Sequence, residues 1–366
     1  MENKDIKVLH IDSEKNWRGG QQQAAYLLEA MVAEGFTTAM VCRPGSAFET
    51  YCREKNLPHF AVSMHGELDI AAGYRIASLC RKHGFTILHL HSAHALATGL
   101  WAKLFCKKLR LIGVRRVFVP VKKNMLSRFK YRTKLVDRMV CISDAVKNQL
   151  VEDGVAEDKL VTIYSGVNLE KFQETVNIPE FRKSLGIPED HVVVGTVAAF
   201  TAEKDYQSLI NAAAAIIKKQ DKVFFCAVGK GSLEEAMAGL ACDLGLKDRF
   251  LFAGFRPDVG PFLKSFDIFV LASYLEGLGT SILDAQALGL PVVACRTGGV
   301  PEIVADEVNG LLVPPKDPEA LMTAILDLVQ HPDKRQRFGE KAKETVREFS
   351  IDKTVEKNIA LYRTLV

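Results

Sequence analysis

Short apolar runs alternate with helix-length amphipathic segments along almost the whole chain. The runs are nearly continuous in apolar residues, which is typical of parallel strands covered on both faces. We expect strands at residues 7–11, 38–42, 60–64, 87–91, 111–114, 139–142 and 160–164, and then at 192–198, 223–228, 250–252, 268–271 and 291–295. This alternation predicts an α/β chain with doubly wound parallel sheets.

The alternation pauses once, over the polar residues 165–188, and then starts again. A chain of 366 residues is also longer than one ordinary domain. We therefore expect two tandem Rossmann-like domains, residues 1–168 and 169–350, facing a cleft. Residues 351–366 form a last expected helix. In such sheets ligands bind beyond the carboxyl ends of the strands, so the loops that follow strands are the candidate sites.

Several classes of protein are disfavoured by the sequence. The eight cysteines include no C-x-x-C pair and lie mostly in apolar runs, which indicates reduced, buried thiols. No cluster of His, Cys or carboxylates has the spacing of metal ligands, so no metal site is expected. No apolar run reaches the length of a signal peptide or a membrane span. We expect a cytoplasmic protein, which can also associate peripherally with the inner face of the membrane.

Two motifs follow strands of the first domain. Gly19 and Gly20 stand between the first strand and a helix, where glycines permit close backbone approach and helix amides favour an anion. A plain turn explains the pair equally well. His89 and His91 end the strand at 87–91, and the alternation of side chains puts both on one face. Their position at a strand end favours a functional His91, with a structural histidine as the alternative.

The second domain has the most informative stretch, residues 271–285. A strand ends there, Glu276 sits on a Gly-rich turn, a helix begins near Thr280, and Asp284 follows one turn later. Two acids beside helix amides suit a ligand that has both hydroxyls and an anion. Lys204, after the strand at 192–198, could meet a diphosphate as a point charge. The alternatives are a helix cap for Glu276 and a solvated loop lysine for Lys204.

Together these segments resemble the retaining glycosyltransferases of family 4, which have the GT-B fold. The resemblance covers nearly the whole chain and is densest over residues 192–315. The matching motifs are S-x-x-E-G-x-G at 273–279, G-x-P-V-V-A at 289–294, G-G-x-P-E at 298–302, N-G-L-L-V-P at 309–314, and upstream W-R-G-G at 17–20, H-x-H at 89–91, I-S at 142–143 and S-G-V-N at 165–168. Each motif is weak alone, but their order and spacing together are specific.

The resemblance implies a role for each matching position. Glu276 would contact hydroxyls of the donor sugar, Asp284 would hold the ribose, and Lys204 would meet the diphosphate. His91 would face the donor sugar near the reacting centre. The remaining implied donor-binding residues are Gly19, Gly20, Gly254, Arg256, Gly277, Leu278, Gly279 and Thr280. The last helix, 351–366, would pack back on the first domain, as in the family.

Two positions depart from the family pattern. The second acid is usually Glu, and Asp284 is one methylene shorter. The family usually has Arg five residues before the lysine, where this chain has Ala199. One cation for the diphosphate is therefore missing, and Arg18, Arg256 or a basic residue of 115–123 are the candidates to replace it.

Charge is distributed unevenly along the chain. Residues 101–138 hold 13 Lys and Arg but one acid, Asp137, and they interleave these bases with apolar side chains. A solvated face over the core is one explanation. We favour docking to an anionic membrane surface or to a phosphorylated glycolipid acceptor. No nucleic-acid-binding motif is present, and no nucleic acid partner is expected.

The function implied by the resemblance is retaining, metal-independent transfer of a sugar from a nucleoside diphosphate donor, most commonly UDP. No cofactor is expected, because the nucleotide sugar is itself the substrate. A membrane-associated glycolipid or polysaccharide, such as lipopolysaccharide, is the favoured acceptor. The alternatives are a small soluble acceptor, or a sugar-nucleotide or glycan-binding module with little turnover. A nucleotide-sugar epimerase is more distant.

Overall fold

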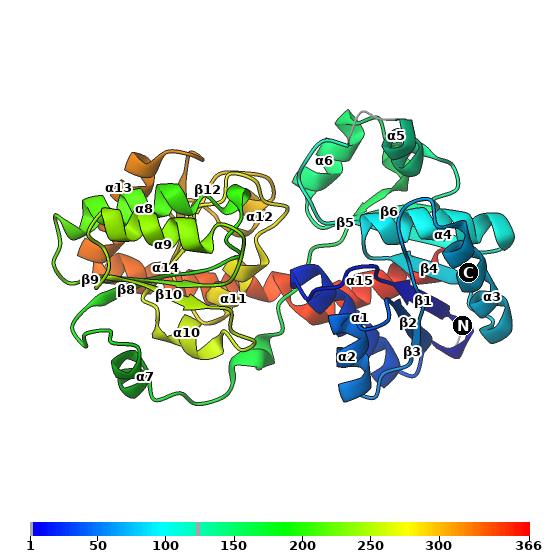
Figure 1. Ribbon diagram of the computed structural model, residues 1–366, viewed down its shortest axis with the longest axis horizontal. Helices are drawn as coiled ribbons and strands as arrows, with labels where there is room; N and C mark the ends of the chain where they lie inside the picture. Colours follow the sequence, from blue (N-terminus) through cyan, green and yellow to red (C-terminus); the bar gives the residue numbers. More distant parts are fainter. Residues whose placement is uncertain (1–2, 122–124) are drawn as a thin grey trace. The chain divides into compact units, whose positions relative to one another are not determined.

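The computed structural model describes residues 3–121 and 125–366, and the chain divides into two compact units (Figure 1). Unit 1 consists of Met1–Gly166 and Ile351–Val366, and unit 2 is Val167–Ser350. The division after Gly166 falls within the polar pause of the sequence. Among the described residues, no helix has both the length and the apolar character needed to cross a membrane.

Unit 1 is built on one parallel sheet of seven strands in the order β3-β2-β1-β4-β5-β6-β7. The strands are β1 (Lys7–Ile11), β2 (Thr37–Cys42), β3 (His59–Ala61), β4 (Ile87–Leu90), β5 (Arg110–Arg115), β6 (Arg138–Cys141) and β7 (Leu160–Thr162). The α-helices are α1 (Gly19–Ala33), α2 (Ala47–Glu54), α3 (Ile70–His83), α4 (Ala93–Phe105), α5 (Met125–Arg132), α6 (Asp144–Glu152) and α15 (Ile351–Arg363). Helix α1 packs beside α15, whereas α3 packs on α4.

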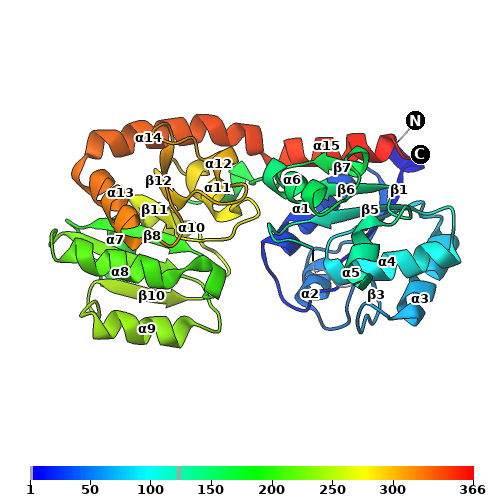
Figure 2. The same cartoon turned by 90° about the horizontal axis from the view of Figure 1, so that it is seen from above.

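Unit 2 repeats the arrangement with six parallel strands in the order β10-β9-β8-β11-β12-β13. The strands are β8 (Val192–Val197), β9 (Val223–Val228), β10 (Phe250–Gly254), β11 (Ile268–Leu271), β12 (Val292–Cys295) and β13 (Gly310–Val313). The α-helices are α7 (Ile178–Ser184), α8 (Tyr206–Ile217), α9 (Glu234–Asp243), α10 (Gly260–Ser265), α11 (Thr280–Ala287), α12 (Val300–Ile303), α13 (Pro318–Gln330) and α14 (Pro332–Thr345). Helices cover both faces of this sheet (Figure 2).

Each sheet has one point where the direction of winding reverses. In unit 1 the first strand, β1, lies between β2 and β4, and in unit 2 the first strand, β8, lies between β9 and β11. The loops that leave two such neighbouring strands run to opposite faces of the sheet. They open a crevice at the carboxyl edge, where ligands bind in folds of this kind. Most candidate residues follow β1, β4, β8 or β11, whereas Gly254 ends β10 and Arg256 follows it.

The last helix, α15, belongs to unit 1 although it comes after all of unit 2 in the chain. It lies along α1 in both views (Figures 1 and 2). Its Tyr362 is fully buried in the same apolar cluster as Ile6, Leu27 and Ile87. The Tyr362 hydroxyl lies 2.5 Å from Nδ1 of His89 in β4, so the helix is attached by a polar contact as well as by apolar packing.

Some expected elements differ from the structure. Strand β13 was not among the expected strands, because it is short and gives little periodic signal. The strand expected at 60–64 is His59–Ala61, and the strand expected at 87–91 ends at Leu90. His91 therefore stands just beyond the strand, although its backbone N–H still donates to the carbonyl of Ile11 in the neighbouring strand, at 2.9 Å.

Two helical glycines of unit 2 give a matched test of the packing. A Cβ at Gly339 in α14 would lie 2.2 Å from the carbonyl oxygen of Gly289, whereas a Cβ at Gly239 in α9 has nothing within 4 Å. Both substitutions to alanine gain helix propensity, but only the first creates a clash. We expect Gly339→Ala to lower the free energy of unfolding by about 1–3 kcal/mol, and Gly239→Ala to raise it by about 0.5–1 kcal/mol.

Urea denaturation followed by circular dichroism measures both variants. If the two alanines change the free energy of unfolding equally, α14 does not pack on Gly289 as described.

Candidate functional site

Lys204 and Glu276 meet at the winding reversal of unit 2. Lys204 ends a short 3₁₀ helix (Ala202–Lys204) after β8, and Glu276 lies on the loop between β11 and α11. The Lys204 ammonium lies 2.9 Å and 2.8 Å from the two carboxylate oxygens of Glu276. The side chains are only 18% and 13% exposed. The two residues are 72 positions apart in sequence and are brought together by the adjacency of β8 and β11.

Backbone contacts hold the loops around this ion pair. The backbone N–H of Tyr274 donates to the carbonyl of Glu203 at 3.0 Å, which joins the loops after β11 and β8. The Thr297 hydroxyl donates to the Tyr274 carbonyl at 2.9 Å, which adds the loop after β12. Asp205 adopts a left-handed conformation, with φ of 47°, and its carboxylate caps α8 by accepting from Ser208. This rarely populated conformation ends the turn at Lys204 and starts the helix.

The start of α11 lies directly after Glu276. Gly279 has a φ of 90°, which favours glycine, and it precedes the first helical residue, Thr280. Because glycine has no side chain to cap the helix, the first amide groups of α11 are available to an anion. Leu278 is buried, main chain and side chain alike. Gly277, Leu278 and Gly279 thus connect Glu276 to the uncapped start of α11 at Thr280.

Asp284 lies one turn into α11 and is partly buried. Burial raises the pKa of its carboxyl group, and the positive charge of Lys171 opposes that rise. A carboxyl group that is short of polar partners is suited to accept hydrogen bonds from ligand hydroxyls.

Gly254 and Arg256 lie farther along the carboxyl edge of the sheet. Gly254 ends β10 with a φ of 70° at a register irregularity, and its carbonyl accepts from the N–H of Gly229 at 3.0 Å. Arg256 is exposed, with its guanidinium over the ring of Phe262, 5.6 Å from the centroid. Strand β10 is two strands from β8, roughly 10 Å at ordinary strand spacing. The described geometry therefore does not bring Arg256 to the Lys204–Glu276 pair.

Three histidines meet at the winding reversal of unit 1. His10 in β1 lies opposite His89 in β4, and His91 follows β4. His10 Nδ1 is 2.9 Å from His91 Nε2, and the rings of His89 and His91 have centroids 4.3 Å apart. All three side chains are buried. Burial lowers the pKa of each, that of His10 to about 3, so the cluster is neutral at physiological pH.

Hydrogen bonding assigns the tautomers of His91 and His10. The Arg116 guanidinium can only donate, and its NH2 group lies 3.5 Å from His91 Nδ1. A neutral His91 that accepts at Nδ1 has its proton on Nε2 and donates it to His10 Nδ1. His10 then bears its own proton on Nε2. Both ring nitrogens of His91 are engaged within unit 1, which favours a positioning role over proton transfer.

Among the described residues, these three histidines are the cluster whose side chains lie close enough together to be considered as metal ligands. One ligand atom from each of His10, His89 and His91 lies within 4.8 Å of the others. Sequence spacing did not reveal this group, because pairing of β1 with β4 creates it. Two features of the cluster disfavour a metal ion. His91 already uses both nitrogens, and a guanidinium cation adjoins the cluster.

Gly19 and Gly20 form the first residues of α1 rather than a loop before it. The space above Gly20 is occupied, because a Cβ there would lie 3.1 Å from Cδ of Arg116. The start of α1 is held by Gln21, whose amide oxygen accepts from the N–H of Arg18 at 3.1 Å and whose amide nitrogen donates to Asp12 at 2.9 Å. Glycine at position 20 therefore leaves room for the side chain of Arg116.

The basic residues of 101–138 fall into two groups. Some hold the fold together: Lys103 and Arg110 pair with Asp137, Lys130 pairs with Glu67, and Arg115 donates to the hydroxyl of Tyr131. Others are exposed on and around α4 and α5: Lys107, Lys108, Arg128 and Lys134. Lys122, Lys123 and the side chain of Leu126 lie outside the described residues.

Comparison with known proteins decides the family. Residues 177–345 match the model of glycosyl transferases group 1, and residues 17–171 match that of glycosyltransferase family 4. A protein of Methanocaldococcus jannaschii, named an uncharacterized glycosyltransferase, is 30% identical over 75% of this chain and 73% of its own. The chain belongs to the glycosyltransferases of family 4.

Relatives with more specific names also match this family 4 glycosyltransferase. The UDP-Gal:alpha-D-GlcNAc-diphosphoundecaprenol alpha-1,3-galactosyltransferase of Escherichia coli is 26% identical over 99% of this chain and 97% of that protein. Among solved structures, a glycosyltransferase from Rickettsia africae superimposes with a TM-score of 0.87 at 20% identity over 98% of both chains. HepE of Anabaena, in complex with UDP-glucose, gives 0.86 at 20% identity over 99% and 100%. These matches establish the GT-B fold.

Sequence reasoning on this glycosyltransferase missed three residues that lie with the candidate ones, namely His10, Arg116 and Tyr362. His10 had a usable signal, since it is the last residue but one of β1 and so lies near the carboxyl edge where ligands were expected. Arg116 was one of several bases in 115–123, and nothing in their spacing singled it out. Tyr362 is separated from His89 by 273 residues, so only the packing of α15 reveals it.

The raised pKa of Asp284 predicts a pH-dependent cost to stability. A carboxyl group that is harder to ionise in the folded state destabilises the fold once pH rises above its ordinary value near 3.8. We expect Asp284→Asn to raise the melting temperature at pH 7, and this gain to shrink as pH falls towards 4.

Asp221→Asn, at an exposed position of unit 2, is the matched control and should change little at either pH. Thermal unfolding at several pH values measures both variants. A stabilisation by Asp284→Asn that is equally large at pH 4 and pH 7 would contradict the burial of an ionised carboxylate.

Proposed function

We propose that this glycosyltransferase transfers a sugar from a nucleoside diphosphate donor with retention of the anomeric configuration and without a metal ion. The observation on which this rests is the Lys204–Glu276 pair beside the uncapped start of α11. A cation, a carboxylate and backbone amides in one place match the two parts of such a donor near its reactive bond. The cation and the amides suit the oxygens of the diphosphate, and the carboxylate suits the sugar hydroxyls.

The ion pair would serve as the resting state of the donor site. When the diphosphate arrives, Lys204 exchanges Glu276 for phosphate oxygens, and the carboxylate becomes free to accept from sugar hydroxyls. As the bond from the anomeric carbon to the diphosphate breaks, negative charge grows on the leaving phosphate. Lys204 and the first amides of α11, at Thr280 and Ser281, stabilise that charge in place of a metal. The acceptor hydroxyl attacks from the face that the diphosphate leaves, and a phosphate oxygen takes its proton.

His91 would position the donor sugar without titrating. Its imidazole is neutral, since burial lowers its pKa, and its two nitrogens are committed to Arg116 and His10. Asp284 would bind the ribose, with the shorter side chain leaving room for a bridging water. Gly254 and Arg256 would lie towards the base, through the main chain.

The donor nucleotide we favour is UDP. This is supported by the UDP-glucose complex of the similar HepE fold and by the UDP-galactose named for the E. coli relative. The favoured acceptor is a glycolipid or polysaccharide. Its support is the diphosphoundecaprenol acceptor of that relative and the lipopolysaccharide core transferase LpsE of Rhizobium meliloti, which is 36% identical over 43% of this chain and 45% of that protein.

A small soluble acceptor is the second candidate. One relative is the N-acetyl-alpha-D-glucosaminyl L-malate synthase of Bacillus anthracis, 23% identical over 85% of this chain and 83% of that protein. Its named product includes malate, a small anion. Assays with a lipid-linked and a water-soluble acceptor in parallel separate the two candidates.

Unit 1 has a surface that fits an anionic bilayer. Apolar side chains are exposed around α4 and α5, with Met125 86%, Phe129 55% and Leu104 53% accessible. Between the two helices lies an apolar pocket of about 230 Å³, lined by Trp101, Leu104 and Phe129 among others. The exposed bases Lys107, Lys108, Arg128 and Lys134 surround this region in sequence. Apolar insertion together with basic charge is the combination that favours acidic phospholipids.

Substitution of Glu276 tests the transfer site. Glu276→Gln keeps the shape of the side chain but removes the charge that pairs with Lys204. We expect the rate of sugar transfer to fall by about 100-fold or more, while the fold and nucleotide binding persist. Glu235→Gln, on the exposed face of α9, is the control and should retain full activity.

The configuration of the product is read by nuclear magnetic resonance. Unchanged turnover of Glu276→Gln would remove Glu276 from the site, and an inverted product would overturn the retaining mechanism.

Membrane docking is tested by sedimentation with vesicles of phosphatidylcholine, with and without phosphatidylglycerol. We expect binding that requires phosphatidylglycerol and weakens in high salt. The double variant Leu104→Ser/Met125→Ser should bind about tenfold less, because two apolar side chains no longer enter the bilayer. Leu244→Ser/Val308→Ser, at exposed apolar positions of unit 2, is the control. Equal binding by both double variants would reject α4–α5 as the docking surface.

A further inference from the structure

Arg116 forms no ion pair with any described residue. Among the described residues, no carboxylate lies within 4.0 Å of its guanidinium, the distance that defines the ion pairs of this protein. Its NH1 group donates to the Ser165 hydroxyl at 3.4 Å and its NH2 group to His91 at 3.5 Å, both at the long limit of hydrogen bonding. Its Nε is buried and has no hydrogen-bond partner. A guanidinium with five donors therefore makes two weak contacts.

The residues around Arg116 leave space for its side chain inside unit 1. Its side chain crosses over Gly20, where any Cβ would meet it at 3.1 Å. Burial lowers the pKa of Arg116 to about 10, which the charge of Asp12 partly offsets. Asp12 already accepts from Gln21 and from the N–H of Glu14. An ionised group that is buried and incompletely paired is costly, so its retention indicates a missing partner of opposite charge.

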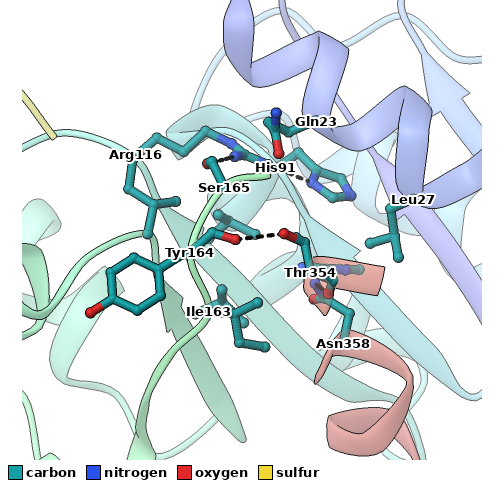
Figure 3. A pocket seen from close by; sticks show the side chains of 13 residues that line it. Gln23, Leu27, His91, Arg116, Ile163, Tyr164, Ser165, Thr354 and Asn358 are labelled. Atoms are coloured by element: carbon teal, nitrogen blue, oxygen red, sulfur yellow. Dashed lines mark hydrogen bonds between the residues drawn. The ribbon is translucent and has the colours of Figure 1, made fainter. Parts of the chain in front are cut away.

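The position of Arg116 is that of a ligand-binding residue. It directly follows β5, which neighbours β4, so it stands at the carboxyl edge of the unit 1 sheet. A pocket there, of about 20 Å³, is lined by Arg116, His91, Ser165 and Gln23 among others. Figure 3 shows the guanidinium between Ser165 and His91. The volume holds one water-sized group, such as a single phosphate oxygen, with the rest of the phosphate outside.

We propose that Arg116 binds a phosphate group of a substrate, with the Ser165 hydroxyl as a second donor. This rests on the proposed function, because a phosphorylated substrate is what such an enzyme handles. The planar guanidinium can donate two hydrogen bonds to a phosphate, and the hydroxyl can donate a third. The phosphate belongs either to the donor's diphosphate or to a phosphorylated acceptor.

The other candidates of the sequence lack this combination. Arg18 is exposed. Arg256 is exposed and lies over Phe262. Arg115 is buried but already donates to the Tyr131 hydroxyl at 3.0 Å and to the Val119 carbonyl at 2.6 Å.

The test compares Arg116→Gln and Arg116→Lys with the control Arg75→Gln, an exposed arginine of α3. Dissociation constants are measured for UDP and for uridine, which lacks phosphate. Melting temperatures are measured in inorganic phosphate and in sodium chloride of equal ionic strength. Arg116→Lys keeps the charge and serves as the binding variant if Arg116→Gln does not fold.

If the phosphate is that of the donor, Arg116→Gln weakens UDP binding by tenfold or more and leaves uridine binding unchanged, with Arg116→Lys between it and the wild type. If it is that of an acceptor, UDP binding is unchanged, but the stabilisation by inorganic phosphate is lost in Arg116→Gln alone. Variants that match the wild type in both measurements overturn the proposal. A wild type that binds no nucleotide but is stabilised by phosphate through Arg116 would refute the proposed donor and not the phosphate site.

Discussion

The reversal of winding within each parallel sheet is the constraint on which both candidate sites depend. It places β4 beside β1 and β11 beside β8, so that loops distant in sequence share one carboxyl edge. The Lys204–Glu276 pair and the His10–His91 pair are the chemical consequences. Without these two strand pairings, neither set of side chains would meet.

The two edges differ in charge and in hydrogen bonding. In unit 2, a lysine and a glutamate neutralise each other while helix amides beside them remain available. In unit 1, an arginine has no carboxylate partner among the described residues, and the three histidines beside it are neutral. Unit 1 therefore has one positive charge that a ligand would satisfy. Unit 2 has an ion pair that a ligand with both phosphate and hydroxyl groups would separate, with the phosphate on Lys204 and the hydroxyls on Glu276.

The elements that support these edges are held by contacts of long range. The Tyr362 hydroxyl ties α15 to His89, and Gln23 exchanges two hydrogen bonds with the backbone of Gly166 where unit 1 ends. Glycines are placed where side chains or backbone must pass closely, as at Gly20 beneath Arg116 and Gly339 against Gly289.

The sequence by itself determined the strand and helix alternation and the residue types at strand ends, because these depend on local periodicity and on short motifs. Lys204, Glu276 and the glycines before α11 could all be named in this way. The tertiary structure alone decided the partners: Glu276 for Lys204, His10 for His91, Tyr362 for His89, and Gly20 for Arg116. The residues in these contacts are between 72 and 273 positions apart in the sequence. A single sequence contains no local signal for pairings over such separations.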